Sequence, residues 1–135
     1  MNLKEIDKDI QELIKRRNEL QKLDYNSPKY DDVEEMLHDG EDAFQDKYGD
    51  FLEGILQEIH DKHCPDSDVL MPIAYLAKKY SVSDNGQYSV DASEGVFVET
   101  EKYPGKDTKL VILPNPFRVV LNIAAGNQVV VWEGK

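Results

Sequence analysis

The first hydrophobic pattern in the chain repeats every three or four residues between positions 3 and 23. This spacing puts the repeating positions on one side of an α-helix, so it predicts an amphipathic helix over the segment. One repeating position is Arg17, whose methylene groups can lie along an apolar seam while the guanidinium group reaches a carboxylate. The positions are Leu3, Ile6, Ile10, Leu13, Arg17 and Leu20.

A second helical pattern follows a short polar segment. Ser27 as N-cap, Pro28 at the first helical position, and Asp31 and Asp32 in the first turn are typical of a helix start. The apolar residues in phase with one another are Tyr30, Val33, Leu37, Phe44, Tyr48, Phe51, Ile55 and Ile59.

The two predicted helices form an antiparallel hairpin about the turn at 24–29. This pairing sets Leu20 near Val33, Leu13 near Gly40, and Leu3 near Phe51. Glycine costs about 1 kcal/mol relative to alanine inside a helix, so Gly40 on the inner face indicates a close approach of the first helix or a kink. Because the apolar phase continues across Gly40, we expect one continuous helix, with "HDGED" as its weakest point.

A second apolar stripe on this helix predicts where the sheet docks. It contains Leu52, Leu56, Ile59 and His63 and lies roughly 70° from the first stripe, by the rotation of an α-helix per residue. It is confined to the part of the helix that the first helix is too short to reach. We therefore expect His63 at the edge of a buried interface, with His60 and Cys64 facing elsewhere.

The pattern changes after the segment "CPDSD". Pro72 and the apolar residues Ile73, Leu76, Ala77 and Tyr80 predict a short third helix. Short β-like runs separated by turn signals follow and predict five or six antiparallel strands. Helices first and strands second indicate an α+β fold, in which an N-terminal antiparallel helical hairpin and a short third helix pack on a C-terminal antiparallel β meander. We expect a single domain over 1–135, with the helical hairpin at 1–64, a connector and short helix at 65–80, and the sheet at 81–135.

Three dipeptides mark the predicted hairpin turns: Asn85-Gly86, Pro104-Gly105 and Gly126-Asn127. The second turn predicts the cross-strand pairs Lys102–Asp107 and Val98–Val111, and the third predicts Ile123–Val130 and Leu121–Trp132.

The net charge of −11 is concentrated in one segment. Residues 24–68 hold three basic and fifteen acidic side chains, whereas residues 69–135 hold seven of each. On the second helix, the outward arc carries Asp31, Asp32, Glu35, Asp39, Asp42, Asp46 and Asp50. A solvated face is the ordinary role of such an arc, and its functional alternative is binding to a basic protein surface. We expect a small acidic, non-catalytic binding or regulatory module.

A small-molecule-binding domain or minor enzyme is the alternative from another class. Its pocket would lie between sheet and helices, with His63 as its main polar group and Tyr75 and Trp132 in its lining. At their spacings these aromatic residues also suit an ordinary core.

The segment "EIHDKHCPD" offers a third hypothesis, a divalent metal site at His60 and Cys64. An i, i+4 pair can bind zinc, but structural sites need four ligands and catalytic sites three. The favoured interpretation is the last turn of a helix that Pro65 ends.

Composition limits the remaining function classes. The acidic field disfavours nucleic acid and anionic membrane, and no apolar run has the roughly 18 residues that span a bilayer. One cysteine and a charged N-terminal segment predict a cytoplasmic protein. We expect no cofactor, and a monomer or a homodimer paired through a helix seam or a bare edge strand.

Overall fold

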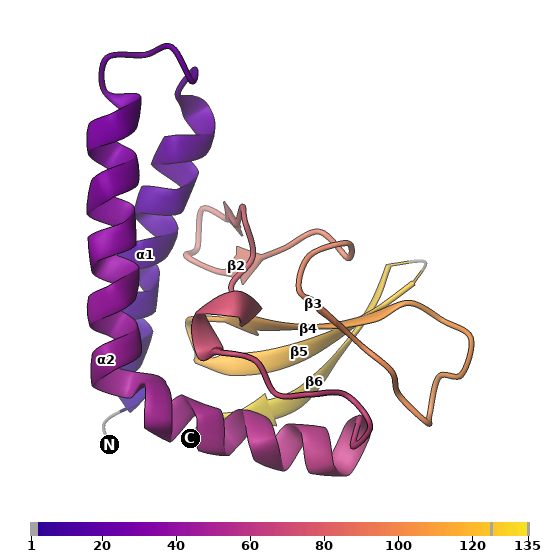
Figure 1. Ribbon diagram of the computed structural model, residues 1–135. Coiled ribbons are helices and arrows are strands. Elements are labelled where there is room, and N and C mark those ends of the chain that lie inside the picture. The colour runs from indigo at the N-terminus through magenta and orange to yellow at the C-terminus, as the bar shows by residue number, and fades with distance from the viewer. Residues whose placement is uncertain (1–2, 125, 135) are drawn as a thin grey trace.

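Two α-helices precede six strands in the part of the chain that the computed structural model describes, residues 3–124 and 126–134. This order confirms the predicted α+β class (Figure 1). The elements are α1 (Leu3–Lys22), α2 (Tyr30–His63), a 3-10 turn η1 (Pro72–Tyr75), β1 (Ser81–Val82), β2 (Tyr88–Ser89), β3 (Val96–Val98), β4 (Thr108–Leu113), β5 (Arg118–Ile123) and β6 (Asn127–Glu133).

The two helices form the predicted antiparallel hairpin. The ammonium group of Lys47 lies 2.6 Å from the Glu5 carboxylate at one end, and Arg16 donates to the Met36 carbonyl oxygen nearer the other end. The start of α2 differs from the prediction: Lys29 is the N-cap and the helix begins at Tyr30. The Ser27 hydroxyl instead accepts the Lys29 N–H, at 3.3 Å, within the preceding turn.

The helix α2 is continuous across Gly40. A Cβ atom there would lie 3.2 Å from a methyl carbon of Leu13, so the predicted close approach of the two helices is confirmed. The predicted weak point at "HDGED" is therefore not a break. Figure 1 shows α2 changing direction further along, where it leaves α1 and crosses the sheet. The buried Gly49 directly follows Lys47 and Tyr48, which contact α1, and glycine is a common site of helix bending.

The six strands form two sheets, which corrects the prediction of one meander. The strands β3-β4-β5-β6 make a four-stranded antiparallel sheet, and β1 and β2 make a separate hairpin about the predicted Asn85-Gly86 turn. The predicted third helix is also wrong, because only η1 forms. Its continuation is extended: Leu76 bridges Ile112 beside β4, and the Tyr80 hydroxyl accepts the Ala77 N–H and donates to the Ile112 carbonyl. These contacts hold the segment against the sheet instead of in a helix.

Two predicted registers are each off by three residues. Val98 lies opposite Thr108, not Val111, because β3 ends at Val98 and a long loop carries the Pro104-Gly105 turn. The Lys102–Asp107 pair lies in that loop, outside the strands.

The last hairpin turns earlier in the sequence than predicted, because β6 already begins at Asn127. Ile123 lies opposite Asn127, and Leu121 lies opposite Val129. A bulge between Val119 and Val120 then shifts the register by one residue. Trp132 consequently lies opposite Val119, not Leu121.

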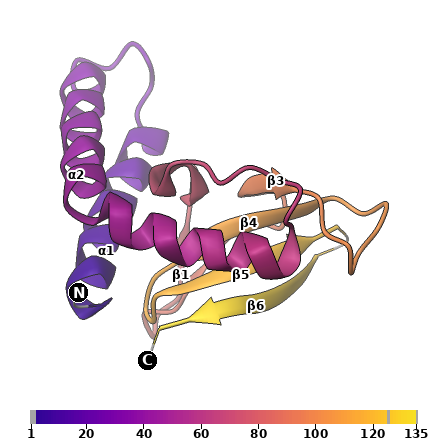
Figure 2. The ribbon, with the colours of Figure 1, turned by 60° about the horizontal axis from the view of Figure 1, so that its bottom comes forward.

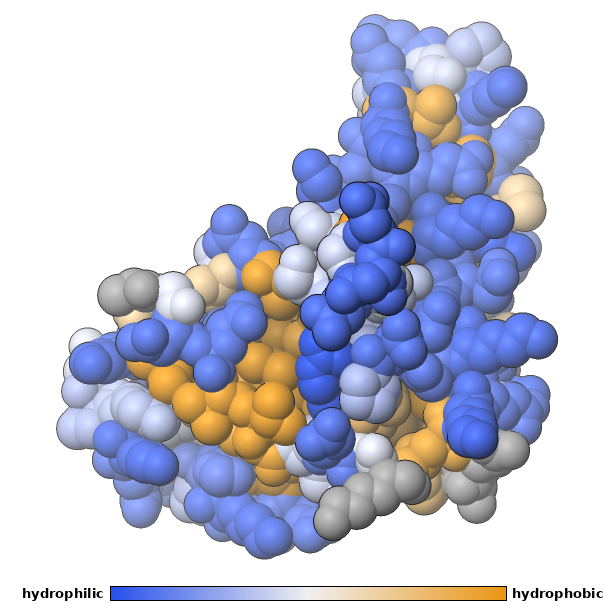
Figure 3. All heavy atoms as spheres, turned by 180° about the vertical axis from the view of Figure 1, so that it is seen from behind, coloured by the Kyte–Doolittle hydropathy of each residue, from blue (hydrophilic) through white to orange (hydrophobic). Residues whose placement is uncertain are grey.

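The core lies between the second half of α2 and the four-stranded sheet, as Figures 1 and 2 show. The opposite face of the sheet is crossed by the segment after β2. Asn122 donates to the carbonyl oxygens of Asp91 and Glu94, and Arg118 donates to that of Tyr88. Seen from behind, apolar surface gathers over the sheet, whereas the helical hairpin is mostly hydrophilic (Figure 3).

Candidate functional site

The acidic face of α2, defined by the seven carboxylates of the outward arc, is fully solvent-facing. The seven residues are Asp31, Asp32, Glu35, Asp39, Asp42, Asp46 and Asp50, and each is exposed. Within residues 3–124 and 126–134, none of these carboxylates has an ion-pair or hydrogen-bond partner. Among the described residues, no cationic side chain pairs with these negative charges.

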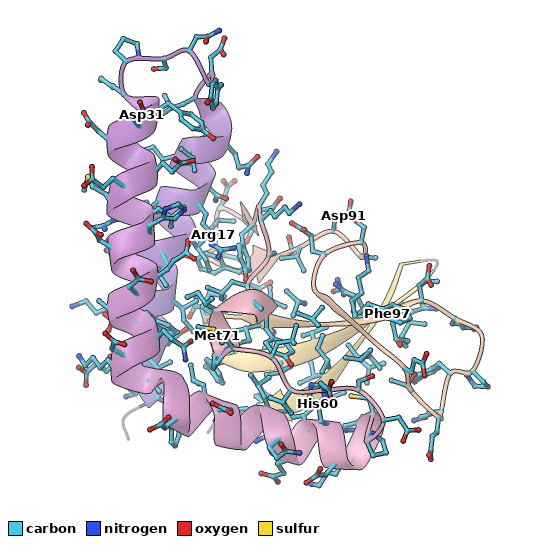
Figure 4. The ribbon with its side chains drawn as sticks, in the orientation of Figure 1. Arg17, Asp31, His60, Met71, Asp91 and Phe97 are labelled. Carbon is cyan, nitrogen blue, oxygen red and sulfur yellow. The ribbon has the colours of Figure 1, made fainter. Side chains whose placement is uncertain are left out.

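The hairpin of α1 and α2 projects from the sheet as an arm, and Asp31 lies near its far end (Figure 4). Arg17, on α1, fastens this arm to the rest of the molecule. Its guanidinium group donates to the Ala77 carbonyl oxygen at 2.9 Å and to the Glu41 carboxylate at 3.3 Å. The predicted role of Arg17, a stem in the seam and a head on a carboxylate, is thus confirmed.

A second attachment lies one residue further along α1. The side-chain amide of Asn18 donates to the Tyr80 carbonyl oxygen and accepts the Tyr80 N–H, at 3.0 and 3.1 Å. Together with Arg17, this reciprocal pair fixes the direction of the arm relative to the sheet. The acidic face therefore lies on an arm that hydrogen bonds hold in a fixed orientation.

The residues of "EIHDKHCPD" are oriented differently from the prediction. His60 and Cys64 are buried, at 1% and 0% exposure, while His63 is only partly buried. The buried stripe continues from Leu56 by steps of four residues instead of passing to His63. The expectation that His60 and Cys64 face away from the core was therefore wrong.

His60 lies near the end of α2 (Figure 4), and both of its ring nitrogens have hydrogen-bond partners. Its Nδ1 lies 2.9 Å from the Ser67 carbonyl oxygen, and its Nε2 lies 2.9 Å from the Tyr75 hydroxyl, which also accepts the Leu70 N–H. Because a carbonyl oxygen only accepts, Nδ1 carries the proton, and the Tyr75 hydroxyl donates to Nε2. Both ring nitrogens are thus occupied, leaving neither lone pair free for a ligand.

Cys64 is the C-cap residue of α2. Burial raises the pKa of its thiol to about 11, so the metal-binding and nucleophilic thiolate is disfavoured near neutral pH. No group of three or more metal-ligating side chains occurs in the described part of the chain. As arranged, His60 and Cys64 act as packed residues that anchor the connector after α2.

His63 lies in a recess of about 340 Å³ together with Lys62, Thr100, Lys102 and Tyr103. Burial, followed by the charges of Lys62 and Lys102, lowers the pKa of the His63 imidazole. The other residues of the predicted pocket lie elsewhere.

Tyr75 is fully buried against His60, and Trp132 packs edge-on against Phe117, with ring centroids 5.5 Å apart. The structure therefore does not gather His63, Tyr75 and Trp132 around one cavity.

Sequence reasoning missed the hydrogen-bonding roles of Tyr75 and Tyr80. Both were taken as members of a short helix or an apolar lining, yet each hydroxyl joins two segments distant in sequence. The spacing of four between Leu52, Leu56, His60 and Cys64 is compatible with a buried His60, but the spacing to Ile59 and His63 is equally compatible with a buried His63.

Comparison with known proteins adds no identity. No protein-family model matches the chain, and neither the curated proteins nor the solved structures contain a match. Among the described residues, no helix combines the length and apolar character needed to cross a membrane.

Proposed function

We propose that the protein is a non-catalytic binding module that presents the acidic face of α2 to a basic surface of a partner protein. The observation that carries the proposal is the set of seven exposed carboxylates without cationic partners among the described residues. The proposal retains the cytoplasmic location expected from the cysteine content.

The electrostatics favour rapid association with a cationic surface. Charges of one sign along an exposed helix produce a field that steers an oppositely charged partner and raises the association rate. Salt screens such a field over about 10 Å at 0.1 M ionic strength, so binding weakens as salt increases.

The bracing of the arm supports the same role. A partner that binds a preorganised surface loses less conformational freedom than one that must order a flexible segment. Arg17 and Asn18 hold the arm in place through hydrogen bonds to the Ala77 and Tyr80 carbonyl groups, so a partner on the acidic face of α2 does not compete with these bonds. Acid–base catalysis, in contrast, needs carboxylates in a partly dry cleft, and these carboxylates are wet.

The test is charge reversal of the acidic face. The triple variant Asp39→Lys, Asp42→Lys, Asp46→Lys is compared with wild type in a low-salt pull-down with quantitative detection of captured proteins. The expected result is loss of basic partners that wild type releases as salt is raised.

The matched control reverses three exposed carboxylates outside the arm, Asp66→Lys, Asp68→Lys, Glu99→Lys, and so changes net charge equally. It is expected to keep the partners. Equal retention by both triple variants, with unchanged salt dependence, would contradict the proposal.

A second candidate function is small-molecule binding in the recess at His63. Its volume, about 340 Å³, lies at the lower end of the range of ligand sites, roughly 300–1,000 Å³. NMR of the histidine ring signals during a fragment-library screen tests it. Fragments that shift the His63 signals and leave those of the exposed His38 unchanged support this function, and a screen without such fragments excludes it.

A further inference from the structure

The strand β6 forms a long, apolar outer edge of the four-stranded sheet. In the described part of the chain it pairs with β5 alone, and Figure 2 shows no further element beyond it. Val129 and Val130 are 38% and 51% exposed, and Val131 and Trp132 are partly buried. An edge strand directs alternate backbone N–H and C=O groups outward, so β6 offers both hydrogen-bonding groups and apolar side chains.

Most of the features that protect edge strands are missing from β6. Natural edges are usually short, covered, or interrupted by lysine or proline. The sequence "NQVVVWE" contains neither residue, and its one charge is Glu133 at the end. A bulge at Val131 leaves Asn127–Val130 as the regular part of the strand.

The opposite edge of the sheet is protected. The strand β3 has three residues, Val96–Val98, and Leu76 occupies the position beside Ile112 where β3 would otherwise continue. Beyond its other end, the Glu99 N–H donates to the Ser67 hydroxyl at 2.9 Å. One free edge in the four-stranded sheet, as far as the structure describes the chain, permits a closed pair, whereas two free edges would permit open-ended chains.

We propose that β6 pairs antiparallel with β6 of a second copy, joining two four-stranded sheets into one eight-stranded sheet. A two-fold axis perpendicular to the sheet places one residue opposite itself. With Val130 at that position, Val129 faces Val131, Gln128 faces Trp132, and Asn127 faces Glu133. This register opposes no like charges and pairs the apolar residues at the centre.

The distribution of charge fits a second copy as the occupant. Residues 69–135, which contain the sheet, hold equal numbers of basic and acidic side chains. The far end of the arm points away from β6, so edge pairing keeps the acidic faces of the two copies apart (Figures 1 and 2). A strongly charged foreign strand would find no counter-charge along Asn127–Val131.

Sedimentation velocity over micromolar to millimolar concentrations tests the pairing. The mass of wild type is expected to rise from 15.5 kDa toward twice that value. Val130→Lys places two ammonium groups opposite each other and is expected to weaken the dimer at least about tenfold. An equimolar mixture of Val130→Lys and Val130→Glu is expected to dimerise again.

The matched control is Phe97→Lys on β3, where the wild-type side chain is 54% exposed. It makes the same kind of change on the opposite edge and is expected to dimerise like wild type. A wild type that stays monomeric, a Val130→Lys variant that dimerises normally, or a mixture that stays monomeric would overturn the proposed pairing.

A measurement on wild type alone guards against misfolding of the variants. Hydrogen–deuterium exchange at low and high protein concentration compares the amides of β6 with those of β3. Protection of β6 that increases with concentration supports the proposal, and protection that is independent of concentration overturns it.

Discussion

The two halves of α2 contrast in what they pack against. The arm half, residues 30–48, buries Leu37, Phe44 and Tyr48 against α1 and exposes most of the acidic face. The docked half, residues 49–63, packs on the sheet and buries Leu52, Ile55, Leu56, Ile59 and His60. A helix that faces one other helix needs only a narrow apolar stripe, whereas one that lies on a sheet buries a wider face. One continuous helix therefore meets both demands by widening its stripe.

The largest expected difference between the halves comes from matched core truncations. Leu56→Ala in the docked half removes a side chain that is 1% exposed, and Leu37→Ala in the arm half removes one that is 5% exposed. Buried leucine-to-alanine changes cost about 2–5 kcal/mol, with the larger costs where the surroundings cannot collapse. We expect Leu56→Ala near the upper end and Leu37→Ala near the lower end, measured by urea unfolding.

Circular dichroism without urea checks that both variants remain folded before their stabilities are compared. An equal or larger cost for Leu37→Ala would show that the arm is packed as rigidly as the core beneath the sheet.

The next largest difference in stability between the halves is expected when one tyrosine hydroxyl group is removed from each. Tyr75→Phe leaves the buried His60 Nε2 without its partner, and it also removes the acceptor of the part-buried Leu70 N–H. An unsatisfied buried group costs about 1–3 kcal/mol. Tyr48→Phe removes a 2.6 Å hydrogen bond to Asp9, whose carboxylate is only partly buried and can be solvated instead.

Thermal unfolding of the two phenylalanine variants is expected to show the larger loss for Tyr75→Phe. The reverse order would mean that the His60 network contributes less to stability than its geometry indicates.

The sequence predicted the arm better than the docked half. The antiparallel hairpin, the approach of Leu13 to Gly40, the Arg17–carboxylate contact and the exposure of the acidic face follow from helical periodicity, which is a local property. The ends of both helices lie within two residues of their predicted positions, although Lys29 and not the predicted Ser27 is the N-cap of α2.

The docked half depended on partners distant in sequence. After Leu56, steps of three and four lead to Ile59 and His63, and a step of four leads to His60 and Cys64; periodicity alone does not choose between them. The choice came from the connector after α2, whose Ser67 carbonyl and Tyr75 hydroxyl bind the His60 ring. Registers failed for a similar reason, because loop length and a bulge set them, not the turn dipeptides.

Two ion pairs between α1 and α2 give a smaller contrast within the arm. Arg17 and Glu41 have side chains 14% and 19% exposed, whereas Lys47 and Glu5 are 56% and 50% exposed. Exposed pairs contribute little, and the loss of one partner costs more as burial increases. Glu41→Gln is expected to lower the free energy of unfolding by about 1 kcal/mol, and Glu5→Gln to leave it unchanged, in parallel urea titrations.

High salt provides the check on these two variants. The effect of Glu41→Gln should persist in high salt because burial limits screening of the pair. If both variants behave alike at low and high salt, the Arg17 contact owes its stability to the Ala77 carbonyl and not to Glu41.

The effect that is smallest at neutral pH, where it vanishes, is a pH dependence that originates at the end of the docked half. Burial raises the pKa of the Cys64 thiol from its ordinary 9.0 to about 11. Below pH 9 the thiol is protonated in both states, and between about 9 and 11 the unfolded chain loses its proton first. The free energy of unfolding should therefore fall over this window, and Cys64→Ala should lack that part of the decline.

The quantity to compare is the slope of the unfolding free energy with pH, not its absolute value, because the buried tyrosines titrate in wild type and in Cys64→Ala alike. Iodoacetamide provides an independent measure: at pH 9 the folded thiol should react far more slowly than the thiol in urea-unfolded chain, of which about half is ionised. Parallel pH profiles for wild type and Cys64→Ala, together with rapid alkylation of the folded protein, would mean that Cys64 is reached by solvent. The end of the docked half would then be as accessible to solvent as the arm.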